Sequence, residues 1–340
     1  MQAEELHEKL KNVDIGVCDY TLDKCRELVP VIERINALKK RRNAIVLAHT
    51  YVLPEIIFGV GDFVGDSYYL ADMARKSEAQ VIVFAAVHFM AETAKILNPG
   101  KIVLHPNLDG GCTLAESITG AEVRELRRQH PEHVFVCYIN TSADVKAACD
   151  VCVTSSNVYS IVENLDADKI YFLPDRLMAQ NLIQHLVERG VKKEVLTSAG
   201  VCYVHEGYEP EMIDYARVKH GKLAVAVHPE CSPAVVARAD YVGSTSGIYN
   251  YVKNTAAERF LLVTECGLGS RIRAELPGKR IIGSCTFCRY MQGNSLALIE
   301  EALLDESGRY EVTLDERVRR DAERCIQRMF EEVARIPKGS

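Results

Sequence analysis

Three cysteines, Cys112, Cys202 and Cys288, are the residues of this chain whose type and spacing point most directly to chemistry. They stand 90 residues apart (112 to 202) and 86 residues apart (202 to 288). Thiolates are soft ligands, which favour zinc or an iron–sulfur cluster over magnesium, calcium or manganese. Because cysteines this far apart match no compact metal motif, they indicate a metal site only if the chain is built from repeats that bring them together.

A phrase that occurs three times indicates such repeats. Each copy runs from an aspartate, through small or β-branched residues, to a hydroxyl side chain five positions later. The copies are Asp62-Phe-Val-Gly-Asp-Ser67, Asp150-Val-Cys-Val-Thr-Ser155 and Asp240-Tyr-Val-Gly-Ser-Thr245. Upstream of each copy, an apolar run ends in one polar residue, in chain order His49, Asn140 and His228. Since the three cysteines follow at similar intervals, the sequence predicts a triplication of small domains.

Length and composition suit three compact units. The chain has 340 residues, of which 48% are hydrophobic, enough to fill two or three separate cores. Short apolar runs alternate with amphipathic segments, as in Ala44 to Ala48, Ser67 to Lys76 and Gln80 to Ala86. This alternation predicts short parallel sheets covered by helices on both faces. The expected fold class is α/β, with three homologous three-layer αβα sandwich domains.

The predicted domain boundaries follow the repeats. We expect a first αβα repeat with N-terminal helices (1–114), a second (115–204), a third (205–292), and C-terminal helices that pack back on the body (293–340). Ligands of parallel sheets gather beyond the carboxyl ends of the strands. If the domains are arranged with pseudo-threefold symmetry and these ends inward, the polar residues and the cysteines meet at one central active site.

The hydroxyl residues Ser67, Ser155 and Thr245 stand where strands give way to helices. Each is therefore predicted at an N-cap or in a first turn, where capping for stability alone is the simpler interpretation of any one of them. Three helix N-termini that face one cavity would bind a substrate with several anionic groups, such as carboxylates or a phosphate. The net charge of −6 does not exclude anion binding, because the electric field within the cavity, and not the charge of the whole chain, determines whether an anion binds there.

The remaining cysteines and charges have simpler interpretations. With twelve cysteines and an N-terminus too polar for a signal peptide, the chain is expected to be cytoplasmic, with thiols that are free, metal-bound or redox-active. No apolar run reaches the roughly 18 residues that span a bilayer. The pair Cys149/Cys152 is interpreted as packing. Buried small hydrophobes are expected at Cys18, Cys25, Cys137, Cys231, Cys266 and Cys325. The basic run Lys39 to Arg42 is expected to face solvent at a helix end rather than bind nucleic acid.

The motifs, taken in order, resemble those of quinolinate synthases, the iron–sulfur enzymes of de novo NAD biosynthesis. The segments that carry the resemblance are Ala48-His-Thr-Tyr51, Phe89-Met-Ala-Glu-Thr-Ala94, Tyr138-Ile-Asn140, Val153-Thr-Ser-Ser-Asn157, Cys202-x-Val-His205, His228-Pro-Glu-Cys231 and Cys288-Arg-Tyr-Met291-Gln-Gly-Asn294. The resemblance implies a [4Fe–4S] cluster on Cys112, Cys202 and Cys288, with one open iron as the Lewis acid of a dehydration. Cys288 is favoured over Cys285, three residues earlier, because it directly precedes the Met291 to Asn294 segment; Cys285 could be a bystander or could pair with Cys288 on oxidation.

The resemblance also implies a reaction. Enzymes of this family condense iminoaspartate with dihydroxyacetone phosphate to quinolinate, releasing phosphate and two waters, which places them among transferases. A functional link to an iminoaspartate-producing enzyme follows, and neither nucleic acid nor membrane is an expected partner. The family's active-site residues fall on His49, Tyr51, Ser67, Tyr138, Asn140, Ser155, His228, Glu230 and Thr245.

Roles can be assigned to these residues as hypotheses. Glu230 is expected to be the general base, with Tyr51 as its partner in proton transfer. His49 and His228 are expected to bind the phosphate or a carbonyl oxygen. The three hydroxyl residues, with their helix N-termini, are expected to hold the carboxylates.

Three alternatives remain open from the sequence alone. A non-enzymatic iron–sulfur sensor or scaffold could use the same thiolates, but it would not need Glu230 and the tyrosines. Another [4Fe–4S] hydro-lyase could act on a small hydroxy-acid, and competition with dihydroxyacetone phosphate would distinguish it. A structural zinc site would lack the brown colour of a cluster.

Overall fold

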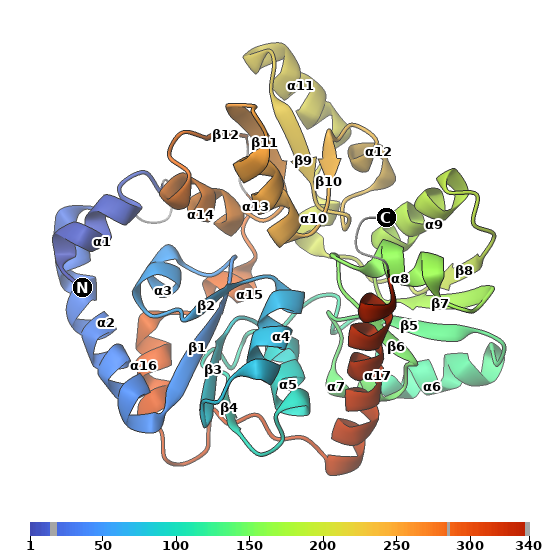
Figure 1. Ribbon diagram of the computed structural model, residues 1–340, viewed down its shortest axis with the longest axis horizontal. Helices are drawn as coiled ribbons and strands as arrows, with labels where there is room; N and C mark the ends of the chain where they lie inside the picture. Colours follow the sequence, from blue (N-terminus) through green and yellow to red (C-terminus); the bar gives the residue numbers. More distant parts are fainter. Residues whose placement is uncertain (14–18, 284–285, 337–340) are drawn as a thin grey trace.

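Three four-stranded parallel sheets form the body of the chain in the computed structural model, which describes residues 1–13, 19–283 and 286–336. All three sheets have the same order, in which the first strand of the unit lies between the second and the third and the fourth lies at the edge. Figure 1 shows the sheets grouped around the middle of the molecule, each with its own helices. We call each sheet with its helices a module. The fold class is confirmed; the domain boundaries and the pseudo-threefold symmetry stay predictions.

The first module contains the sheet β2-β1-β3-β4. The helices α2 and α16 cover one face and α4 and α5 the other, as a three-layer sandwich requires (Figure 1). Its strands are β1 (Ala44–His49), β2 (Phe63–Gly65), β3 (Val81–Ala85) and β4 (Ile102–Leu104). Its helices are α1 (Ala3–Leu10), α2 (Leu22–Arg42), α3 (Pro54–Gly59), α4 (Ser67–Lys76) and α5 (His88–Leu97).

The second module repeats this arrangement in the order β6-β5-β7-β8. Its strands are β5 (Val134–Tyr138), β6 (Val151–Val153), β7 (Lys169–Leu173) and β8 (Glu194–Thr197). Its helices are α6 (Gly120–Gln129), α7 (Ala143–Ala147), α8 (Val158–Asn164), α9 (Arg176–Glu188) and α10 (Tyr203–Glu206).

The third module has the order β10-β9-β11-β12. Its strands are β9 (Ala224–Val227), β10 (Tyr241–Val242), β11 (Arg259–Val263) and β12 (Arg280–Ile282). Its helices are α11 (Pro210–His220), α12 (Pro233–Val236), α13 (Thr245–Asn254), α14 (Gly267–Glu275) and α15 (Arg289–Gln292).

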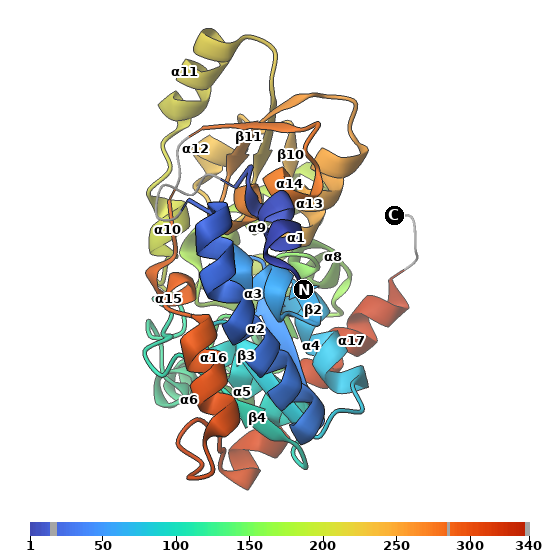
Figure 2. The same cartoon turned by 90° about the vertical axis from the view of Figure 1, so that its left-hand side faces the viewer.

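Two C-terminal helices return to the first two modules. The helix α16 (Leu296–Leu304) lies beside α2 on the outer face of the first module, as Figure 2 shows. The helix α17 (Glu316–Arg335) lies against α7 and β6 of the second module. No helix within the described ranges is both long and apolar enough to cross a membrane.

The aspartate that opens each repeated phrase has the same structural role in every module. Its carboxylate accepts a hydrogen bond from a backbone N–H of the first strand of the sheet, at 2.7 to 2.8 Å, and its own N–H donates to the carbonyl of that same residue at 2.9 Å. The pairs are Asp62 with Val46, Asp150 with Phe135 and Asp240 with Val225. The phrase is therefore a link between the first two strands, which accounts for its recurrence.

Each of these aspartates also has a cationic partner. Lys39 bonds to Asp62 at 2.8 Å, while Arg127 and Arg217 contact the other two aspartates. Lys39 is only 8% exposed, and its ammonium also donates to the carbonyl of Val60 at 2.7 Å. The basic run does end a helix, since α2 stops at Arg42. Nevertheless, the expectation that all of it faces solvent is wrong for Lys39.

Candidate active site

One pocket receives residues from all three modules, at the carboxyl ends of their first strands. His49 ends β1 and Tyr51 follows it, Tyr138 ends β5 and Asn140 follows it, and His228 follows β9. Parallel strands place such residues at one edge of a sheet, and the three edges face one another here. The structure brings together all the residues predicted for the site. They are His49, Tyr51, Ser67, Cys112, Tyr138, Asn140, Ser155, Cys202, His228, Glu230, Thr245 and Cys288.

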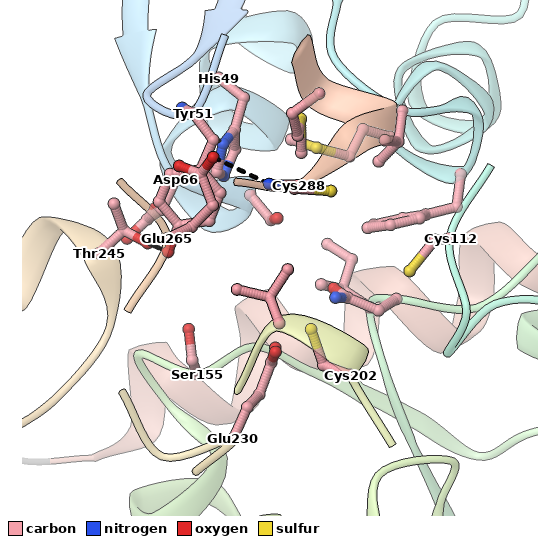
Figure 3. Close-up of a pocket in the computed structure, with 18 of the residues that line it drawn as sticks. His49, Tyr51, Asp66, Cys112, Ser155, Cys202, Glu230, Thr245, Glu265 and Cys288 are labelled. Carbon is pink, nitrogen blue, oxygen red and sulfur yellow. Dashed lines mark hydrogen bonds between the residues drawn. The ribbon is translucent and has the colours of Figure 1, made fainter. Parts of the chain in front are cut away.

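The three cysteines point into this pocket from different segments (Figure 3). All three are free and half-buried. Cys202 and Cys288 occupy the N-cap positions of α10 and α15, and Cys112 opens a turn closed by a bond from the Glu116 N–H to the Cys112 carbonyl. Burial raises the pKa of Cys112 to about 12 and raises the pKa of the other two thiols as well. Without a metal the three therefore stay protonated, whereas a bound cation favours the thiolate.

Three free thiols on one side of a single cavity fit the donor set that an iron–sulfur cluster needs. Each comes from a different segment, so the set leaves room for a group larger than one ion. A second set is tighter: ligand atoms of Cys202, His205 and Glu230 lie within 4.8 Å of one another and could hold a single ion. The two sets share Cys202. Cys285, the alternative to Cys288, lies outside the described residues.

Glu230 is held by two hydrogen-bond donors. The Tyr138 hydroxyl donates to Oε1 at 2.5 Å, and Nδ1 of His205 lies 2.8 Å from Oε2. Burial alone would raise the pKa of Glu230, but the neighbouring imidazoles of His205 and His228 and these two bonds hold the pKa well below its usual range. The carboxylate is thus ionised at neutral pH. Its tyrosine partner is Tyr138, whereas Tyr51 was predicted.

Tyr51 instead connects the first module to the third. Its hydroxyl lies 2.7 Å from Oγ1 of Thr245 and 2.9 Å from Oγ1 of Thr264. Burial raises the pKa of Tyr51 well above 10, so the phenol keeps its proton. Nε2 of His205 also reaches Thr264, at 3.0 Å. A chain of polar contacts therefore runs from Tyr51 through Thr264 and His205 to Glu230.

The two strand-end histidines are neutral. Burial lowers the pKa of His49 to about 4 and that of His228 to about 3. Nδ1 of each histidine accepts from the backbone N–H two residues later, at 3.2 Å in His49 and 3.4 Å in His228. Because Nδ1 is an acceptor, Nε2 carries the proton and can donate it to a ligand oxygen.

The hydroxyl residues occupy two kinds of position. Ser67 and Thr245 are the first residues of α4 and α13, as expected. Ser155 is not at a cap: α8 begins at Val158 with Asn157 as its N-cap, so the prediction for Ser155 is wrong. The reason is local, since Thr154 N–H donates to Oδ1 of Asn157 at 2.7 Å and the chain completes a turn before the helix starts.

Asp66 is a pocket residue that sequence reasoning missed. Its Oδ1 caps α4 through the Tyr69 N–H, while Oδ2 accepts from the Ser244 hydroxyl and the Ser246 N–H of α13. One carboxylate thus serves the N-termini of two helices from different modules. The field of these helices is already partly compensated, which reduces what they can offer a substrate anion.

Glu265 and His205 were also missed. Glu265 is 1% exposed, and its Oε1 accepts from the Cys288 N–H at 3.1 Å (Figure 3), while Oε2 accepts from the Gly267 N–H at 2.6 Å. Burial raises the pKa of Glu265 to about 8. His205 follows Cys202 by three residues, and that spacing was the one signal in the sequence that could have placed it at the site.

Comparisons with known proteins agree with this geometry. A family model described as quinolinate synthetase A protein matches residues 33–331. The chain belongs to the quinolinate synthase family. A quinolinate synthase of Sinorhizobium medicae is 43% identical over 329 residues, covering 96% of this chain and 88% of the relative. Another, from Xylella fastidiosa, is 45% identical over 299 residues, covering 88% of this chain and 86% of the relative.

Membership of the quinolinate synthase family settles the class of the protein. It is an enzyme of NAD biosynthesis from an iron–sulfur family, which confirms the family and the enzymatic function predicted from the motifs. A non-enzymatic sensor is thereby disfavoured. The matched range includes all three sheets and every residue that lines the pocket.

Proposed function

We propose that this chain condenses iminoaspartate with dihydroxyacetone phosphate to form quinolinate, releasing phosphate and two waters. The observation that carries the proposal is the meeting of three free thiols and a buried Glu230, Tyr138 and His205 network in one pocket. Iminoaspartate is the imine that an enzyme forms by oxidising an amino acid. Because imines hydrolyse readily in water, such an enzyme would have to supply it while this chain is at work.

Cys112, Cys202 and Cys288 would hold a [4Fe–4S] cluster. A cluster with three cysteine ligands supplies a Lewis-acidic iron with one open coordination position, suited to the loss of a hydroxyl group. Each of the three can present a thiolate to the pocket from a different segment of the chain. The single-ion set of Cys202, His205 and Glu230 would instead remove Glu230 from proton transfer, so we favour the thiol set.

Substrate anions would be bound without cationic side chains. Among the described residues that line the pocket there is no lysine or arginine. The donors are Nε2 of His49 and His228, the hydroxyls of Ser67 and Ser155, and the Asn140 amide. Oδ1 of Asn140 is buried without a hydrogen-bond partner in the described structure, so it is placed to accept from an N–H or O–H group of a substrate while the amide NH₂ donates to an anion. Preorganised neutral donors can stabilise phosphate and carboxylate in a water-poor cavity.

Proton transfer would centre on Glu230 and the two phenols. The reaction requires phosphate elimination, imine formation and ring dehydration, each of which moves a proton. The ionised Glu230 accepts a proton, and Tyr138, in direct contact with it, returns one. Tyr51 reaches the same network through Thr264 and His205, so its role becomes that of a second, indirect proton donor.

Anaerobic reconstitution tests the proposal. The reconstituted protein should contain close to four iron and four sulfide per chain, and should form quinolinate from the two substrates. Cys112→Ala should lose both iron and product, while Cys25→Ala, at a buried position in α2 far from the pocket, should keep both. Iron binding without product would point to a sensor. Zinc in place of iron would contradict the cluster.

The second candidate is an iron–sulfur hydro-lyase acting on another small hydroxy-acid. The same cluster and base could dehydrate such a substrate. Turnover of a hydroxy-acid that dihydroxyacetone phosphate inhibits without being consumed would favour this alternative.

A further inference from the structure

Four cysteines outside the active site meet in the interior of the second module. Cys137, Cys149, Cys152 and Cys325 are all free, and none is more than 9% exposed. We call them the thiol cluster. Sequence reasoning treated each as packing, but four thiols from four segments gathered at one point are more than single small hydrophobes, so their mutual geometry matters.

The sheet and the last helix bring these thiols together. Cys137 on β5 pairs in register with Cys152 on β6, so their side chains leave the sheet on the same face. Cys149 lies just after α7, which covers that face together with α17. Cys325 comes from α17, and its Sγ lies 3.6 Å from Sγ of Cys137. Figure 1 shows α17 crossing beside β6 and α7 at this place.

The surroundings of Cys137 favour a thiolate. The Lys146 side chain is fully buried, and its ammonium donates to the backbone carbonyls of Ile139 and Thr141. Among the ion pairs of the described residues none includes Lys146, whose ammonium also lies 5.5 Å from the centre of the Phe89 ring, so a negative sulfur nearby would help to balance its charge. Burial by itself raises the pKa of Cys137, but the neighbouring thiols and Lys146 hold the pKa well below its ordinary value.

The spacing is unlike that of a zinc site. Four thiolates around zinc, each about 2.3 Å from the metal, lie roughly 3.8 Å from one another. Among the described residues, the one group of three candidate ligands whose atoms all fall within 4.8 Å of one another is that of Cys202, His205 and Glu230. Cys137 therefore lies at the centre of the thiol cluster: its Sγ is 3.6 Å from that of Cys325, and Cys149 and Cys152 also lie in contact with it.

We propose that Cys137 and Cys325 are a site of reversible oxidation by hydrogen peroxide, which joins them in a disulfide and ties α17 to β5. The Cys137 thiolate attacks the O–O bond, becomes a sulfenic acid and releases hydroxide, which takes up a proton as water. The Cys325 thiol then attacks that sulfur; the S–S bond forms and the sulfenic oxygen leaves as a second water. Two thiols are oxidised, and one peroxide is reduced.

Peroxide is the fitting oxidant because it is close to water in size and the site is closed to larger reagents. The bond would link two segments 188 residues apart, which fixes the C-terminal helix on the second module. It would also act next to Tyr138, the residue that contacts Glu230, so the pair lies one residue from the active-site network.

The test uses the full-length protein with its cluster, treated anaerobically with increasing hydrogen peroxide. Remaining thiols are blocked under denaturing conditions, and the digested protein is analysed by mass spectrometry. We expect a peptide pair joined through Cys137 and Cys325 that disappears on treatment with dithiothreitol. The melting temperature of oxidised wild type should exceed that of oxidised Cys325→Ala by about 3 to 6 °C. Because Cys325→Ala also removes a buried side chain, the link is measured within each protein: dithiothreitol should lower the melting temperature of oxidised wild type and leave that of oxidised Cys325→Ala unchanged.

Two variants keep the test decisive. Cys149→Ala leaves the close pair in place and should still give the joined peptides, while Cys25→Ala controls for removing any buried cysteine. If Cys137 and Cys325 are both still blocked as free thiols after peroxide has oxidised the iron, the proposal fails. It also fails if Cys137 is joined to Cys149 or Cys152 instead of Cys325, if the joined pair is Cys149 with Cys152, or if untreated protein carries zinc that Cys137→Ala removes.

Discussion

Replacement of Glu230 by glutamine separates proton transfer from cluster binding. Glutamine has the same shape, so the Tyr138 hydroxyl can still donate to its oxygen, and its amide can face Nδ1 of a His205 that donates from Nε2 to Thr264 instead. The cavity keeps its packing, and the three cysteines are untouched. What is lost is the negative charge and the ability to accept a proton.

The size of the effect follows from the two contacts. Hydrogen bonds to a charged group contribute about 1.5 to 3 kcal/mol and neutral ones about 0.5 to 1.5 kcal/mol. The two hydrogen bonds that hold Tyr138 and His205 against residue 230 therefore weaken by roughly 2 to 3 kcal/mol in total. Loss of a positioned base costs about a hundredfold to ten-thousandfold in rate. The two losses overlap, and we expect Glu230→Gln to reduce kcat by at least about a thousandfold, or roughly 4 kcal/mol.

The assay compares quinolinate formation with the visible absorption and iron content of the same anaerobic samples. Glu230→Gln should keep the absorption and the iron of wild type while forming almost no product. Glu211→Gln, an exposed position on α11, is the matched control and should behave as wild type. Normal turnover by Glu230→Gln would refute its role as the base. Loss of iron would instead show that Glu230 acts through the metal, as in the alternative ligand set.

Three other expectations follow from the contacts. Lys39→Met leaves Asp62 without its cation and should lower the free energy of unfolding by about 2 kcal/mol in urea titrations, whereas Lys40→Met, at an exposed position, should not. Burial lowers the pKa of His105 from 6.5 to about 4, so the unfolded chain takes up a proton that the folded chain refuses as pH falls through this window. The contribution of His105 to stability should drop by about 1.5 kcal/mol between pH 6.5 and about 5. His49 and His228 add their own losses in the same direction, so His105→Gln should reduce the slope by its share rather than abolish it. Ser155→Ala should raise the KM for substrate without changing iron content, because Ser155 lines the pocket but caps no helix.

Much of the fold and the membership of the site could be predicted from the sequence. The segments predicted at Ala44 to Ala48, Ser67 to Lys76 and Gln80 to Ala86 are β1, α4 and β3 in the structure, with ends that differ by no more than one residue. The site residues follow first strands or open helices, and their positions relative to these elements can be read from the local sequence. The equivalence of the repeats then implies that these residues meet in one site, because the same position in each module lies at the same edge of its sheet.

The partners of these residues could not be predicted in the same way. The hydroxyl of Tyr138 reaches Glu230 from another module, and Asp66 caps helices of two modules at once. Such contacts depend on how the modules pack, to within an ångström, and no local pattern encodes that distance. The tyrosine in direct contact with Glu230 could not be identified for this reason: both tyrosines enter the cavity, and only the packing decides which phenol reaches the carboxylate. The role of Tyr51 in proton transfer stays a prediction.

The thiol cluster is a second case in which contacts between distant segments could not be predicted from the sequence. Cys149 and Cys152 form a conspicuous pair in the sequence, yet the close sulfur pair is Cys137 with Cys325, 188 residues apart. Parallel pairing of β5 with β6 aligns Cys137 and Cys152, and α17, at the far end of the chain, supplies the fourth thiol. Cysteine chemistry depends on distances between sulfur atoms, and in a chain whose last helix returns to its second module these distances bear no relation to spacing along the sequence.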